Sequence, residues 1–465
     1  MRRYKNAATN GHEGLLTLFF NWLRLKSFIA AIQWLENIVN KTNIAGLFWF
    51  CCFDQSGKQE LFYCMKLIKP IRLLNWKNWL QLTLLTVLLF FVFLFYNNGN
   101  FVLDGEESLL TRMDIGREMM LPKTYKAPYR FIFINVSKDL QLVKDDYGAD
   151  NVITDREKLA SFFNLLNQRN KHRFLLADLI FDLPADNDSL LEKELPNLQK
   201  VIFPRHLGDS GFLPSVFSVP SAIADYSTNN KKFSKFRLMY QDSLKTLPVA
   251  IHEALNKVTY EVKHGSVYCN GKYNLQNIPP RYFIRPFQLQ TTKEYPYFNL
   301  GDLLVLASDS SFYNQFLEDR FIVLGNFDTD VHITPIGKMP GVMILLNTFL
   351  SLLDGRAQPS AGWFIMIFII FFIINLYVLY GKKPEPKKTD HKNWWQLFIY
   401  NLLHGILANF VSIAGLCLLI TVLSDFIFHI KPHTFIIFMY IIIWQGILKY
   451  YQVWKKQRQP APKSA

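Results

Sequence analysis

The sequence predicts an integral membrane protein with an α/β extracytoplasmic domain, built on a mostly parallel sheet with flanking helices, and four transmembrane α-helices. Three observations predict this fold class. Four long apolar stretches could each cross a bilayer, basic residues gather on one side of them, and strand-like and helix-like segments alternate between the first two stretches. At 465 residues the chain is long enough for two or three domains.

Each apolar stretch is long enough to span a hydrocarbon core of about 30 Å as a helix. The four stretches are residues 79–96, 363–380, 397–423 and 434–454. Aromatic side chains stand at several of their ends, as anchors at a membrane interface do. The first stretch lies too deep in the chain to be a cleaved signal peptide.

The distribution of charge predicts the orientation of these spans. Residues 1–78 carry 11 Lys or Arg against 4 Asp or Glu, the loop 381–393 carries 5 against 2, and the tail from residue 449 carries 5 against none. Residues 97–362 carry 29 against 30, so the net charge of +14 lies on one side. Because basic loops stay in the cytoplasm, we expect a bacterial inner-membrane protein with residues 97–362 outside. The same charge predicts contact with membrane lipid and not with nucleic acid.

The remaining boundaries follow from the spans. They are a basic lead at 65–78, a cytoplasmic loop at 381–396, a short outer loop at 424–433 and a cytoplasmic tail at 455–465. Residues 1–64 form an N-terminal extension that has two interpretations. Arg24 and Lys26 interrupt its apolar run, which is typical of a helix lying on the membrane surface. Alternatively the translation start is misassigned and the native chain begins at Met65.

Strands and helices alternate in the outer region. We expect strands at 130–136, 173–184, 200–204, 267–270, 281–287 and 320–327. We expect helices at 154–168, 187–198, 298–307 and 340–355. In the first helix, Thr154 and Glu157 have the spacing of a capping box. Strands alternating with helices indicate βαβ units, and strands buried on both faces explain the nearly continuous apolar runs.

Polar residues follow two of the predicted strands. Asp182 ends one strand, while Asp328, Asp330, His332 and Thr334 follow another. Loops at the carboxyl ends of parallel strands form a binding crevice, so these residues could converge to bind a divalent metal or a small polar ligand. Ordinary turn chemistry also explains them, and we favour that reading. It assigns turn roles to Gly325, Pro335, Gly337, Pro340 and Gly341.

Asp178 differs from the other candidates because it interrupts a wholly apolar run. An unpaired carboxylate there is costly, so we expect a buried partner such as Arg156 or a place in the crevice. In the third span, Asn401 and His404 favour hydrogen bonding between helices. Cys269 is the single cysteine of the outer region, which excludes a disulfide within it.

The outer region between the first two spans contains the motifs DREKLASFF, ADLIFD, RFIVLGNFDTDVHITPIGKMPGV and NTFLSLLDG. In these motifs, and in the order of domain and membrane helices, the chain resembles the type-two CHASE domain. That family is the extracellular sensory module associated with cyclases and histidine kinases. The resemblance covers about residues 128–355 and the helices beyond, and it implies detection of an extracytoplasmic signal. The family's first strand often ends in aspartate, where this chain has Asn135. Only KKQRQPAPKSA follows the fourth span, so we expect output through a separate partner.

Three functions remain as expectations. The first is a membrane sensor, and the second is a constitutive scaffold or assembly subunit. The third is a metal-dependent hydrolase using Asp182, Asp328, Asp330 and His332. The chain shows no nucleophile elbow and no His-Glu-x-x-His, so we predict no enzyme and no cofactor. The sequence leaves three questions open: whether the protein binds a metal, whether it forms a homodimer, and which signal it detects.

Overall fold

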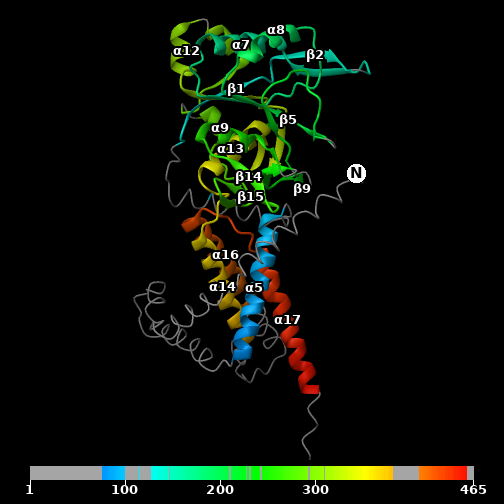
Figure 1. Ribbon diagram of the computed structural model, residues 1–465, viewed down its shortest axis with the longest axis vertical. Helices are drawn as coiled ribbons and strands as arrows, with labels where there is room; N and C mark the ends of the chain where they lie inside the picture. The colour runs from blue at the N-terminus through cyan, green and yellow to red at the C-terminus, as the bar shows by residue number, and fades with distance from the viewer. Residues whose placement is uncertain are drawn as a thin grey trace, which may run out of the picture. The chain divides into compact units, whose positions relative to one another are not determined.

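The computed structural model describes residues 76–99, 115, 127–380 apart from short gaps, and 408–457 (Figure 1). The chain divides into two compact units, which we describe separately. The α/β unit is Asn98–Pro359 with His429–Lys431, and the helical unit holds the rest. Several predictions lie outside the described residues. They concern residues 1–64, the loop 381–396, the end of the tail, and the pair Asn401 and His404.

The α/β unit is built on a six-stranded, fully parallel sheet in the order β18-β1-β19-β4-β5-β8. Its strands are β1 (Arg130–Asn135), β4 (Phe174–Ala177), β5 (Val201–Arg205), β8 (Ser221–Ile223), β18 (Tyr297–Asn299) and β19 (Arg320–Gly325). β1 and β19 pair along their whole length, from Arg130 opposite Arg320 to Asn135 opposite Gly325. The predicted α/β class with a mostly parallel sheet is confirmed.

Helices cover both faces of this sheet (Figure 1). Successive strand side chains point to opposite faces. Phe131 and Phe133 pack with α9 (Leu247–Asn256) and α13 (Gly341–Leu353). Ile132 and Ile134 lie in the second core with four other helices. These are α7 (Arg156–Arg169), α8 (Asp188–Glu194), α11 (Leu300–Leu306) and α12 (Ser310–Phe316).

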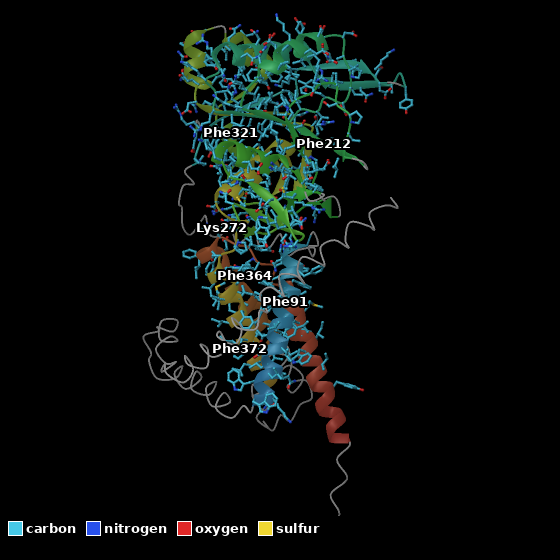
Figure 2. The ribbon with its side chains drawn as sticks, viewed as in Figure 1. Phe91, Phe212, Lys272, Phe321, Phe364 and Phe372 are labelled. Atoms are coloured by element: carbon cyan, nitrogen blue, oxygen red, sulfur yellow. The ribbon has the colours of Figure 1, made fainter. Side chains whose placement is uncertain are left out.

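Aromatic rings fill the first core. Phe321 of β19 lies among them (Figure 2), with ring centroids 5.2 Å from Phe131, 5.6 Å from Phe174 and 5.5 Å from Phe349. Phe349 comes from α13, so this cluster attaches that helix to the three central strands. Aromatic pairs contribute about 0.5–1.5 kcal/mol each beyond their area burial.

Short antiparallel pieces surround the main sheet. They are the hairpin β2 (Leu140–Lys144) with β3 (Asp150–Thr154), the pair β6 (Leu207–Gly208) with β7 (Gly211–Phe212), and the sheet of β9 (Thr228–Asn229), β10 (Lys232–Phe233), β20 (Val331–Thr334) and β21 (Gly337–Pro340). The others are β11 (Phe236–Arg237) with β17 (Asn277–Ile278), β12 (Met239–Tyr240) with β13 (Leu244–Lys245), and the meander β14 (Tyr260–Lys263), β15 (Ser266–Cys269) and β16 (Lys272–Asn274).

Four predictions need correction. Asp155 caps α7, accepting from the N–H groups of Glu157 and Lys158, so the capping box is wrong because Thr154 ends β3. The strand predicted at 173–184 is shorter and ends at Ala177, directly before the ionisable Asp178. The segment 281–287 is no strand, and α10 (Pro286–Thr291) begins within it. The helix predicted at 298–307 is divided between β18 and α11.

Polar side chains join the helices of the helical unit. Its described helices are α5 (Trp76–Asn98), α14 (Ala361–Tyr380), α16 (Ala408–Phe428) and α17 (Phe435–Gln457). Asn375 of α14 donates to Thr86 of α5 at 3.1 Å and accepts from Tyr440 of α17. Trp363 of α14 donates to Ser424 of α16 at 2.6 Å. Within the described residues, α5 is the one helix that meets the length and composition test for crossing a membrane.

We predict that Asn347→Leu destabilises the α/β unit by about 2–3 kcal/mol. The buried Asn347 side chain accepts from the Ile284 N–H at 3.0 Å and donates to the Ile284 carbonyl at 2.9 Å. Leucine leaves both backbone groups buried without a partner. Denaturant unfolding of the purified protein measures the loss. The control Asn314→Leu, at an exposed position of α12, should change stability by less than about 0.5 kcal/mol. Equal losses in both variants would contradict the assignment.

Candidate functional site

Loops after four of the parallel strands bring polar side chains to the carboxyl end of the sheet. We call this group the carboxyl-end cluster. It consists of Asp178 and Asp182 after β4, His206 after β5, Asp225 and Tyr226 after β8, and Asp330 and His332 after β19. The carboxyl ends of parallel strands share one edge, which is why residues so distant in sequence meet there.

Asp178 is the first residue after β4, and it continues the pairing with β19. Its N–H donates to the Leu324 carbonyl at 2.8 Å. Two glycines allow the chain to approach it closely. A Cβ at Gly325 would lie 3.3 Å from the Asp178 Cβ, and one at Gly341 would lie 3.4 Å from the Asp178 Oδ2 and collide with the Asp330 carboxylate. Any larger residue at Gly341 would therefore displace both carboxylates from the start of α13.

Two histidine–aspartate pairs belong to the cluster. His332 Nε2 lies 2.8 Å from Asp330 Oδ1, and His206 Nδ1 lies 2.5 Å from Asp225 Oδ1. The ring of Tyr226 meets that of His332 edge to face, with centroids 5.0 Å apart. The Leu207 N–H also donates to Asp225, at 2.6 Å. Each imidazole therefore has a carboxylate that orients it.

The Asp178 carboxylate has no such partner. Among the described residues, none forms a hydrogen bond or ion pair with this partly buried group. Burial and then the charge of Asp330 raise the pKa of Asp178 to about 7, although His332 and His206 lower it. The hydrogen bond that His206 donates to the Asp225 carboxylate raises the pKa of His206. Asp178 can therefore gain or lose a proton near neutral pH, which a carboxyl in water cannot.

Arg156 does not pair with Asp178, against the expectation from the sequence. Its Nε lies 3.3 Å from Asp188 Oδ1, its guanidinium donates to the Leu183 carbonyl at 3.2 Å, and it covers the ring of Phe181. The reason is the early end of β4. Asp178, directly after β4, lies beside Gly325 and Gly341, whereas Arg156 lies beside Leu183 and Asp188.

The other predicted residues separate into two groups. Asp182 is exposed, and its charge contributes to the raised pKa of His206. Asp328 instead accepts from Asn135 at 3.0 Å and from Ser137, neither of which belongs to the cluster. Those hydrogen bonds lower its pKa, the Ser137 bond most. Asn135 thus holds the Asp328 loop on β1, a role that a second carboxylate could not fill.

Turn roles account for the remaining candidates. Thr334 is buried and donates to the Gly337 carbonyl at 2.7 Å, closing the turn between β20 and β21 that also contains Pro335. Gly337 has φ +115°, a backbone conformation that favours glycine. Pro340 ends β21 directly before α13.

Sequence reasoning missed His206, Asp225 and Tyr226. His206 stands two residues after the predicted strand 200–204, so the same rule for carboxyl ends could have found it. β8 has three residues and gave no clear sequence signal, so Asp225 and Tyr226 could not be placed. Among the described residues, no group of three or more His, Cys, Asp or Glu is arranged to hold a metal ion.

A scan against models of protein families, a search of curated proteins and a search of solved structures each return no match. The carboxyl-end cluster is therefore interpreted from its own geometry.

We predict that Asp178→Asn changes how stability depends on pH. The native pKa of about 7 exceeds the ordinary 3.8, so between these values the native state holds the Asp178 proton more tightly than the unfolded state. The stabilising effect of that proton is complete below about pH 4 and is lost as the pH rises to about 7. Relative to the variant, wild type should lose stability across this interval, which denaturant unfolding at each pH measures.

The exposed Asp150 of β3 provides the matched control for this experiment. Asp150→Asn should leave the wild-type profile unchanged in shape. His252, whose pKa burial lowers to about 4, titrates in all three proteins and cancels in the comparison. A wild-type-minus-Asp178→Asn difference that is constant from pH 4 to 7 would show that Asp178 is an ordinary carboxyl.

Proposed function

We propose that this chain is a multi-pass membrane sensor whose α/β unit lies outside the cytoplasm and detects a small cationic solute at the carboxyl-end cluster. The observation that carries the proposal is the Asp178 carboxylate, which has no protein partner among the described residues and lies beside the first residue of α13. A carboxylate left unpaired in a partly buried place is costly, and a cation would remove that cost.

The composition of the cluster supports a positively charged ligand. It combines four carboxylates, of Asp178, Asp182, Asp225 and Asp330, with two imidazoles. A bound ammonium group would favour the ionised form of Asp178 and so compete with its proton. The aromatic ring of Tyr226 also attracts cations to its face. The hydrolase hypothesis gains no comparable support, because hydrogen bonds to Asn135 and Ser137 give Asp328 a structural role.

The position of α13 supports transmission of the signal. The Gly341 N–H donates to the Asp330 carbonyl at 2.9 Å, so α13 begins at the cluster. It is buried from Gly341 to Leu352 and is about 20 Å long at about 1.5 Å per residue. Hydrogen bonds from Asp354 and Arg356 then hold the following turn to its last residues. Only seven residues connect the end of α13 to the start of α14. A connection this short would absorb little of a shift of α13.

Several observations support the membrane arrangement. α5 is long and apolar enough to span, and α14, α16 and α17 have 20, 21 and 23 residues. His429–Lys431, in the predicted outer loop, group with the α/β unit. We place the protein in a bacterial inner membrane, where α14 passes the signal to a separate cytoplasmic partner. The resemblance to type-two CHASE domains implies the same role and stays a prediction.

We predict that cations stabilise the full-length protein through Asp178. Thermal unfolding in detergent with Ca²⁺, Mg²⁺, putrescine and arginine should reveal at least one stabilising cation, by about 2.7 kcal/mol at a hundredfold excess over its Kd. The gain should fall as the pH is lowered, because protons occupy Asp178. Asp178→Asn and Asp330→Asn should lose the gain, whereas the control Asp150→Asn should retain it. Equal gains in all four proteins would exclude the cluster as the site.

A second candidate function is a constitutive scaffold, favoured by the β2–β3 hairpin. Leu142 and Val152 lie directly opposite each other and are 72% and 60% exposed, and Tyr147 at the tip is 96% exposed. Figure 1 shows this hairpin extending away from the sheet. Apolar side chains grouped on a projecting hairpin are typical of a protein-binding surface.

Crosslinking in native membranes followed by mass spectrometry separates the two functions. If the sensor proposal holds, we expect a cytoplasmic signalling protein whose yield changes with the stabilising cation and is unaffected by Leu142→Ser. A scaffold instead predicts a partner whose yield ignores cations and drops at least severalfold with Leu142→Ser. Leu190→Ser, at an exposed leucine of α8, is the control for loss of surface leucine in general.

A further inference from the structure

An open groove of about 370 Å³ lies between α5 and α17 in the helical unit. Six residues of α5 from Lys77 to Leu88 line it, together with Trp444 of α17. We call it the α5–α17 groove. Leu80, Leu84 and Leu88 recur at every fourth position, so they form one ridge along the helix, and all three are exposed.

The groove changes from polar to apolar along its length. Lys77 and Gln81 are one turn apart at the N-terminal end of α5, and both are exposed. Beyond them only leucines and Trp444 line the wall. The distance along the helix from Lys77 to Leu88 is about 16 Å at about 1.5 Å per residue. One leaflet of a hydrocarbon core is about 15 Å thick, which is half of about 30 Å.

These features are complementary to an amphiphile with a negative head. Among the described residues, no carboxylate pairs with Lys77. The sequence directly before it adds Lys66, Lys69 and Arg72, so anionic headgroups are attracted to this end of α5. A further protein helix fits less well. Helices that associate in membranes meet through small residues, and the α5 wall of this groove consists of leucines with Lys77 and Gln81.

We propose that the α5–α17 groove binds one anionic phospholipid of the cytoplasmic leaflet. Its phosphate lies at Lys77 and Gln81, and one acyl chain runs along Leu84 and Leu88 against Trp444. The proposal rests on the proposed function in one respect: α5 spans the membrane with its N-terminal end in the cytoplasm. Because the acyl chain contacts both helices, the bound lipid stabilises the pairing of α5 with α17.

Native mass spectrometry of the full-length protein tests the proposal. The protein is reconstituted in nanodiscs of phosphatidylcholine and phosphatidylglycerol in equal amounts and released into detergent. Wild type should retain about one phosphatidylglycerol in preference to phosphatidylcholine. Lys77→Gln should lower phosphatidylglycerol retention about fivefold, the effect of one lysine near an anionic surface. Leu84→Trp fills the groove and should remove retention of both lipids.

Leu419→Trp is the matched control, because this leucine of α16 is exposed and lies outside the groove. It should retain the lipid as wild type does. Equal retention of the two lipids by wild type, or undiminished retention in Lys77→Gln, overturns the proposal. Lys77→Gln changes only an exposed side chain, so this result does not depend on Leu84→Trp folding.

Accessibility of residue 77 separates failure of this inference from failure of the proposed function. Lys77→Cys, in a chain whose five native cysteines are replaced, is labelled in sealed inverted vesicles and in right-side-out vesicles with a membrane-impermeant maleimide. Labelling from the cytoplasmic side without lipid selectivity overturns the lipid site alone. Labelling from the outer side overturns the membrane orientation and with it both proposals.

Discussion

Burial of both faces of the six-stranded parallel sheet is the constraint on which the α/β unit depends. Strands that are apolar on both sides need helices above and below, and α13 is buried almost throughout because it fills one of these layers. Polar side chains are thereby excluded from the middle of the strands. They can occur only where the strands end, which is where Asp178, Asp330 and the two histidines lie.

Other buried polar groups of the unit have hydrogen-bond or ion-pair partners within the protein. Asn347 exchanges two hydrogen bonds with Ile284, and Arg156 has Asp188, a carbonyl and an aromatic ring. These groups stabilise the fold because each has a partner. Asp178 lies against a carboxylate, with its imidazole neighbours bound to other aspartates. The contrast separates Asp178 from the structural polar residues of the unit.

The helical unit uses polar groups sparingly. Asn375 links α5, α14 and α17 through Thr86 and Tyr440. In a membrane such bonds specify which helix faces meet, since hydrocarbon solvates leucine as well as protein does. The α5–α17 groove lies where this pairing leaves leucines of α5 exposed.

The sequence by itself determined the α/β class, because long apolar runs between amphipathic segments require a parallel sheet covered by helices. It also located β1, β5, β19 and α13, whose patterns are local, and it identified the Asp330–His332 loop. The tertiary structure decided the strand order, which places β19 between β1 and β4. That order brings Asp330 to Asp178 and leaves Arg156 to Asp188. No local pattern encodes such pairings, because they depend on which distant strands become neighbours.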